Sequence, residues 1–146
     1  MRNGRPGYWI GASIRGIAVW ENRILIAEDN EILLDATATA LELAGYLVDR
    51  ASDGAEALDA IEHNPPAAIL LDLRMPVVDG YGVAQELKRR GLRIPIIVMT
   101  TAEQGQFWAR KMDAVAFLPK PFGAGELVAM VQRLGLWPRG PDSAVA

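Results

Sequence analysis

The sequence predicts an α/β protein built on a doubly wound, five-stranded parallel sheet. Short apolar runs alternate along the chain with longer segments in which apolar residues recur at helical spacing. One run, 67–72, is apolar up to its final aspartate, as expected for a strand buried on both faces of a parallel sheet. The 146 residues, 51% hydrophobic and 23% charged, are typical of a single globular domain.

Five predicted strands and five predicted helices alternate from Arg23 onward. The strands are short apolar or β-branched runs, at 23–27, 46–51, 67–72, 94–101 and 114–118. The helices carry apolar residues at helical spacing, at 31–44, 54–64, 79–91, 102–112 and 124–136. Such alternation is typical of parallel strands joined by crossing helices, so we expect no second domain.

The first two helices have clear start and stop signals. Asn30 is a good N-cap for the first helix, and Gly45 suits the position after its end. Asp53 and Glu56 have the spacing of a capping box at the start of the second helix. The prolines at 65–66 end that helix before the central strand begins.

The later elements are bounded in the same way. Asp79 is a cap for the third helix, and Gly91 ends it. Pro95 lies near the start of the fourth strand, where proline is tolerated. Gly105 is expected to break a weaker fourth helix, and 119–123 ("PKPFG") is expected to be a turn after the fifth strand.

The composition narrows the classes of function. The net charge of -3, with no basic stripe, argues against direct nucleic-acid binding. The absence of cysteine excludes disulfides and thiolate chemistry, and it is compatible with the cytoplasmic location that we expect. The single histidine, His63, cannot form a histidine-rich metal site. No apolar run approaches the roughly 20 residues of a membrane span.

The chain divides into an N-terminal extension at 1–22, the main domain at 23–136 and a Pro/Gly-rich tail at 137–146. Because Arg15 interrupts the apolar centre of the extension, we do not expect a signal peptide. The four tryptophans, Trp9, Trp20, Trp108 and Trp137, could either cover apolar surface or form an interface. Aromatic residues are enriched in both settings, so the sequence does not decide whether the protein dimerises.

Polar side chains follow several of the predicted strands at the end where parallel strands place ligand sites. They are Glu28, Asp29, Asp72, Thr100, Thr101 and Lys120. Clustered carboxylates repel one another, and a divalent cation that prefers oxygen ligands, such as Mg²⁺, relieves this repulsion. A carboxylate can also act as the nucleophile toward a phosphoryl group. The pattern therefore predicts Mg²⁺-dependent chemistry at an aspartate, with Lys120 balancing charge.

Four segments, in order, resemble the receiver domain of two-component response regulators. They are "ILIAEDN", "ILLDLRMPVVDG", "IPIIVMTT" and "FLPKPF". The resemblance covers 23–136 and implies the flavodoxin-like (βα)5 receiver fold. It further implies that Asp72 is the phosphoacceptor. Each of the following roles is also implied by the resemblance alone: Asp29 as a direct Mg²⁺ ligand, Glu28 mainly through water, the Arg74 backbone carbonyl as a further ligand, Thr100 as the switch hydroxyl, Lys120 as the phosphate partner, Phe117 as a buried switch aromatic, and a cis Lys120-Pro121 bond.

The implied function is that of a stand-alone response regulator, not an enzyme beyond its own phosphotransfer and autodephosphorylation. A sensor histidine kinase or a histidine phosphotransfer protein would supply the phosphoryl group, and a downstream protein would read the switch or receive the phosphate. The start of the first helix is a candidate kinase-docking surface, although Ile32 and Leu33 are more simply placed in the core. No membrane contact is expected.

Two other classes of protein compete with this interpretation. One is a degenerate receiver that binds proteins without being phosphorylated. Against it, the chain retains all five expected site residues, Glu28, Asp29, Asp72, Thr100 and Lys120. The other is an enzyme. An aspartyl phosphatase would need a second acid where Arg74 stands, and a flavin binder would need a Ser/Thr/Gly-rich loop where "EDNE" follows the first strand.

The chain departs from the family pattern at four places. The segment from Thr100 to Lys120 is about two residues short, and Asp113-Ala114 stands where the family has Gly-Ala, which reshapes the fourth helix. Thr101 replaces a smaller residue and could restrict access to Asp72. The other two departures are glycine to valine at Val77 and serine or threonine to glycine at Gly123, a weaker cap by a few tenths of a kcal/mol.

Overall fold

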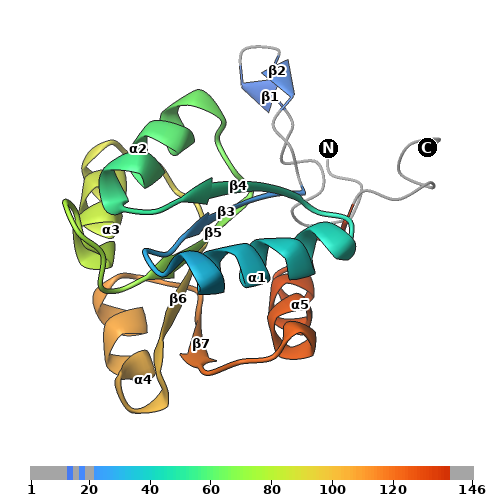
Figure 1. Cartoon of the computed structure of the whole chain (residues 1–146). Coiled ribbons are helices and arrows are strands. Elements are labelled where there is room, and N and C mark those ends of the chain that lie inside the picture. The colour runs from blue at the N-terminus through green and yellow to red at the C-terminus, as the bar shows by residue number, and fades with distance from the viewer. Residues whose placement is uncertain (1–12, 15–16, 19–21, 139–146) are drawn as a thin grey trace.

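The computed structural model describes residues 13–14, 17–18 and 22–138 (Figure 1). It contains a five-stranded parallel sheet with the order β4-β3-β5-β6-β7. Its strands are β3 (Arg23–Ala27), β4 (Leu47–Ala51), β5 (Ala68–Asp72), β6 (Ile96–Thr101) and β7 (Ala116–Lys120). The predicted α/β fold class is confirmed, and β5 is the fully buried central strand.

Five helices cover the two faces of the sheet (Figure 1). They are α1 (Glu31–Leu43), α2 (Gly54–His63), α3 (Gly80–Arg89), α4 (Ala102–Lys111) and α5 (Ala124–Arg133). One core cluster joins α1 and α5 to the sheet, with Leu41 and Leu127 among its buried residues. The second cluster joins α2 and α3 to the other face, and Trp108 and Phe117 pack against it on the α4 side. Residues alternate between these clusters along β5, so the pleat of one strand supplies both cores.

The predicted helix caps are formed. Asn30 accepts a hydrogen bond from the backbone N–H of Leu33, and Asp79 accepts one from Gly82. Gly45 and Gly91 have φ values of 101° and 73°, the left-handed conformation that favours glycine after a helix. These caps set where α1 and α3 begin and end.

The capping box of α2 differs in one bond from the prediction. Asp53 accepts from the N–H of Glu56 as expected, but the Glu56 carboxylate accepts from the N–H and hydroxyl of Ser52 instead of from Asp53. In α5, the weak cap at Gly123 is supported by the Glu126 carboxylate, which accepts the Gly123 N–H at 2.9 Å. A side-chain acceptor therefore covers the start of every helix except α4.

Two predictions about the last third of the chain are wrong. Gly105 does not break α4, which runs without interruption from Ala102 to Lys111. The final strand lies two residues later than expected, so Pro119 and Lys120 belong to β7 and not to a turn. Because β7 is an edge strand, a proline within it need not leave a neighbouring strand without a partner.

Within the extension, β1 (Ser13–Ile14) and β2 (Ile17–Ala18) pair in an antiparallel manner. The predictions for Trp9, Arg15, Trp20 and most of the C-terminal tail concern residues outside those described. Of the helices that the structure does describe, none has the length and apolar character needed to cross a membrane.

Candidate functional site

Three carboxylates meet at the C-terminal edge of the sheet. Glu28 and Asp29 directly follow β3, and Asp72 ends the neighbouring strand β5, where Ala27 and Leu71 are in register. One carboxylate oxygen from each of the three lies within 4.8 Å of the others. Glu28 and Asp72 are 2% and 6% exposed, so both negative charges are held almost out of water.

Lys120 provides the positive charge at this edge. Its Nζ lies 2.9 Å from Oε1 of Glu28 and 3.0 Å from Oδ1 of Asp72. Burial alone would lower the pKa of Lys120, but its hydrogen bonds to the two carboxylates and their negative charges raise it. Burial raises the pKa of Glu28, and Lys120 only partly opposes this. The lysine therefore stays charged between the two acids.

The carboxylate of Asp72 is held through one of its two oxygens. Oδ1 accepts hydrogen bonds from Lys120 and from the backbone N–H of Leu73, at 3.0 and 2.9 Å. No residue in the described part of the chain donates to Oδ2. One oxygen is thus fixed in place while the other is available to a metal or to a reacting group.

Two glycines hold the loop after Asp72 by close backbone contact. A Cβ at Gly80 would overlap the carbonyl oxygen of Asp72, and the Gly80 N–H donates to the Leu73 carbonyl at 2.9 Å. A Cβ at Gly54, the first residue of α2, would overlap the carbonyl oxygen of Val78. A larger side chain at either position would push the loop away from the site.

The donor set at this edge fits a hard divalent cation. Three carboxylates within one small space supply only oxygen ligands, which Mg²⁺ prefers over nitrogen or sulfur. Asp29 is exposed and is open to a hydrated ion, whereas Glu28 is buried and already bonded to Lys120. Arg74, whose carbonyl is the fourth predicted ligand, lies on the loop two residues after Asp72.

The two predicted switch residues lie on adjacent strands. Thr100 is 7% exposed at the end of β6, opposite Pro119 of β7. Phe117 is half-buried, not fully buried as expected, and packs beneath α4, where a Cβ at Gly105 would overlap its ring. The Lys120-Pro121 peptide bond is cis, as the resemblance implied.

Residues beside the site show how far its surface is exposed. Thr101 is exposed and occupies the N-cap position before α4, but its hydroxyl makes no capping bond. The expectation that Ile32 belongs to the core is wrong, because this side chain is 84% exposed at the start of α1. Leu33 is half-buried. Ile32 is therefore an exposed apolar side chain three residues after Asp29.

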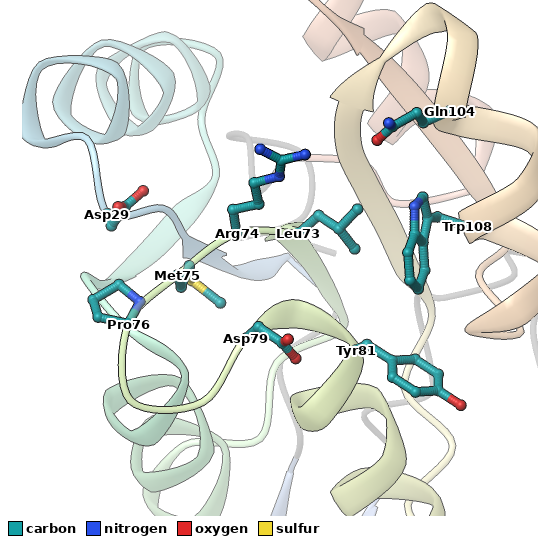
Figure 2. A pocket seen from close by; sticks show the side chains of 9 residues that line it. All are labelled: Asp29, Leu73, Arg74, Met75, Pro76, Asp79, Tyr81, Gln104 and Trp108. Atoms are coloured by element: carbon teal, nitrogen blue, oxygen red, sulfur yellow. The ribbon is translucent and has the colours of Figure 1, made fainter.

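A cleft of about 690 Å³ runs from the acidic edge toward α4 (Figure 2). Asp29 and Pro76 lie at one end of it, and Tyr81 and Trp108 lie at the other. The remaining lining residues are Leu73, Arg74, Met75, Asp79 and Gln104. Sequence reasoning did not place Tyr81, Gln104 or Trp108 beside the site, since the break expected at Gly105 left the orientation of α4 undefined.

Comparison with known proteins gives a consistent result. Residues 24–132 match the family model described as the response regulator receiver domain. The response regulator MprA of Mycobacterium sp. (strain KMS) is 39% identical over 114 residues, which are 77% of this chain and 50% of that protein. MprA of Mycolicibacterium vanbaalenii is 38% identical over 77% of this chain and 49% of its own length. The chain thus spans about half the length of these curated relatives.

Solved structures agree with the fold. The chemotaxis response regulator CheY4 of Vibrio cholerae has a TM-score of 0.71 and 28% identity, covering 77% of this chain and 97% of that one. A response regulator structure from Chloroflexus aurantiacus has a TM-score of 0.70 and 30% identity, covering 78% and 97%. The expectation of no direct nucleic-acid binding is not supported, because the curated relatives extend well beyond the region that this chain matches.

Proposed function

The chain belongs to the response regulator receiver domain family, and from this premise we propose that Asp72 accepts a phosphoryl group from a phosphohistidine. The donor would be a sensor histidine kinase or a histidine phosphotransfer protein. The observation that supports this most directly is the position of Asp72, with Oδ1 bonded to Lys120 and Oδ2 without a donor among the described residues. A nucleophile needs such an available oxygen.

The residues around Asp72 suit transfer of a phosphoryl group. A bound Mg²⁺ would neutralise negative charge on the phosphoryl oxygens. Asp29, Asp72 and the Arg74 carbonyl would hold this ion directly, and Glu28 would hold it through water. Oδ2 of Asp72 forms the new bond to phosphorus as the phosphorus–nitrogen bond to the donor imidazole breaks. The Lys120 ammonium, which is bonded to Asp72, would balance part of the added charge.

Phosphorylation would be reported by Thr100 and Phe117. The Thr100 hydroxyl would donate a hydrogen bond to a phosphoryl oxygen, and the half-buried ring of Phe117 would respond because it lies on the next strand and under α4. The affected surface would bind a downstream protein, or the phosphoryl group would be relayed. Action as a stand-alone domain, and in the cytoplasm, stays a prediction.

Intact-mass measurement after incubation with acetyl phosphate and Mg²⁺ tests the proposal. We expect one added phosphoryl group, none after chelation of Mg²⁺, and none in Asp72→Asn. Asp79→Asn is a matched control, because its carboxylate caps α3 and is not part of the acidic cluster. If neither acetyl phosphate nor any histidine kinase labels the protein, the alternative of a phosphorylation-independent binding module takes its place.

A further inference from the structure

The cleft beside the acidic edge has an aromatic far end that the proposed phosphotransfer does not use. At its near end it is lined by Asp29 and by Leu73 and Arg74, the two residues that follow Asp72. At its far end, Trp108 of α4 faces the cleft beside Tyr81 of α3 (Figure 2). Its volume of about 690 Å³ falls within the range of small-molecule sites, roughly 300–1,000 Å³.

The aromatic end is held in place by its neighbours. The ring of Trp108 meets that of Tyr81 edge-on at a centroid distance of 5.8 Å, and that of Phe107 edge-on at 5.2 Å. The Lys111 ammonium lies over Tyr81 and over Phe107, at 5.7 and 5.9 Å from the ring centroids. The Trp108 ring is therefore held by two aromatic contacts in the absence of a ligand. This lowers the entropic cost of binding a ligand ring to Trp108.

The cleft is lined by the carboxylates of Asp29 and Asp79 and by the guanidinium of Arg74, so it favours an anion only when a cation is bound at the acids. The Arg74 side chain is exposed and extends along the cleft toward the α4 side (Figure 2). With Mg²⁺ on the acids, the near end would present this guanidinium and a metal, and the far end would present aromatic carbon. A ligand with a phosphoryl group at one end and a flat ring at the other matches both ends.

We propose that this cleft is a subsite for the ring of a small aromatic phosphoryl donor, of the aryl acyl phosphate class, whose phosphoryl group is transferred to Asp72. The inference rests on the proposed function. In the step, an Asp72 oxygen forms a bond to phosphorus, and the bond from phosphorus to the acyl oxygen breaks. The electron pair leaves with the aromatic carboxylate, so the reaction needs neither a proton nor a redox partner.

The test compares two donors with the same reactive group. Second-order rates of Asp72 phosphorylation are measured with benzoyl phosphate and acetyl phosphate, and the ratio of the two rates is taken for each variant. We expect Trp108→Ala to lower this ratio about threefold to tenfold, the effect of losing one aromatic contact. Trp108→Leu, which keeps apolar volume, should also lower it. Trp137→Ala, an exposed tryptophan outside the cleft, should not.

The ratio within one variant cancels any general damage to the site. Comparing this ratio between variants cancels the intrinsic difference in reactivity between the two donors. Equal ratios in the parent protein, Trp108→Ala and Trp108→Leu would overturn the subsite. If neither donor labels Asp72, the proposed function is decided separately, by whether any histidine kinase labels the protein. The cleft is then judged by binding of benzylphosphonate against methylphosphonate in Mg²⁺: a preference for the ring that is lost in Trp108→Ala supports the subsite, and equal binding rejects it.

Discussion

Gly105 in α4 lies directly against the ring of Phe117 in β7, so that a Cβ added to the glycine would overlap Cδ2 of the phenylalanine. Gly105 is the only buried residue of α4. The helix can therefore approach the sheet this closely only because one of its residues lacks a side chain.

Replacing Gly105 with alanine should destabilise the protein. Alanine is favoured over glycine in a helix by about 1 kcal/mol, but forcing a methyl group into the Phe117 ring costs roughly 1–3 kcal/mol. Urea unfolding measures the balance. Gly125→Ala in α5 is the control, since a methyl group added there would meet no atom within 4 Å and the variant should gain stability. Equal gains in both variants would show that α4 is not held against Phe117.

Lys120→Met should lower stability in the absence of metal, and Mg²⁺ should restore part of it. Glu28 and Asp72 then lose their shared cation, and the loss should stay below the roughly 3–5 kcal/mol of a fully buried pair because Lys120 is partly exposed. Melting temperatures with EDTA and with Mg²⁺ give both values. Lys88→Met, which breaks the exposed pair with Asp113, should change little under either condition. A melting temperature in Lys120→Met that does not respond to Mg²⁺ would contradict the metal site.

Thr101→Ala should speed phosphorylation of Asp72 by acetyl phosphate. The threonine is exposed at the start of α4, and its hydroxyl caps nothing, so its removal changes bulk beside the site without breaking a bond. Its partner in register is Lys120, which holds Asp72. Thr101→Ser, which removes only the methyl group, should give an intermediate rate. An unchanged rate in Thr101→Ala would show that bulk does not limit access.

Ionisation of Tyr46 should lower the stability of the folded protein in strong alkali. Burial raises the pKa of Tyr46 from 10 to about 12, and its hydroxyl donates to the carbonyl of Leu136. The unfolded chain releases this proton first, so the stabilisation is complete below pH 10 and is lost as the pH rises through about 12. The expected loss is roughly 2 kcal/mol by pH 12. Denaturant titrations give the free energies of unfolding of the parent protein and of Tyr46→Phe. The difference between these two free energies should be smaller at pH 12 than at pH 9.

Val77→Gly should stabilise the protein. Val77 has a φ of 68°, a conformation that a β-branched residue rarely adopts, and the N–H of Val78 closes a tight turn by donating to the Pro76 carbonyl. Its side chain is 77% exposed, so its loss removes little packing. Relief of about 1–3 kcal/mol of strain should exceed the added flexibility of glycine in the unfolded chain, about 0.4–1 kcal/mol.

Asp113→Gly provides the comparison for Val77→Gly. Asp113 also has a positive φ, 56°, but aspartate tolerates this conformation far better than valine. Its replacement should give no comparable gain in urea unfolding. Equal effects at the two positions would mean that the valine backbone is not strained.

The acidic edge could be predicted from the sequence because parallel strands bring their last residues together. Glu28, Asp29 and Asp72 directly follow or end apolar runs, so chain order alone placed them near one another. Lys120 was placed at the same edge even though its strand was predicted two residues too early. The error arose from Pro119, whose missing N–H suggests the end of a strand unless the strand is known to lie at an edge.

The α4 side could not be predicted in the same way. Glycine disfavours a helix locally, but the contact of Gly105 with Phe117, on a different strand, outweighs that preference. The orientation of α4 follows from this contact, and with it the position of Trp108 in the cleft. Tertiary packing of this kind is absent from the local pattern of residues.

The contact between Gly54 and the backbone of Val78 determines where a reporter protein could be inserted into this chain. The segment 73–80 is held by main-chain contacts at both Gly54 and Gly80, so a fluorescent insert there would displace the loop that follows Asp72. The connection at 91–93 is exposed and lies between α3 and β6. An insertion there should leave the acidic edge intact, which makes it the better position for a biosensor of phosphorylation.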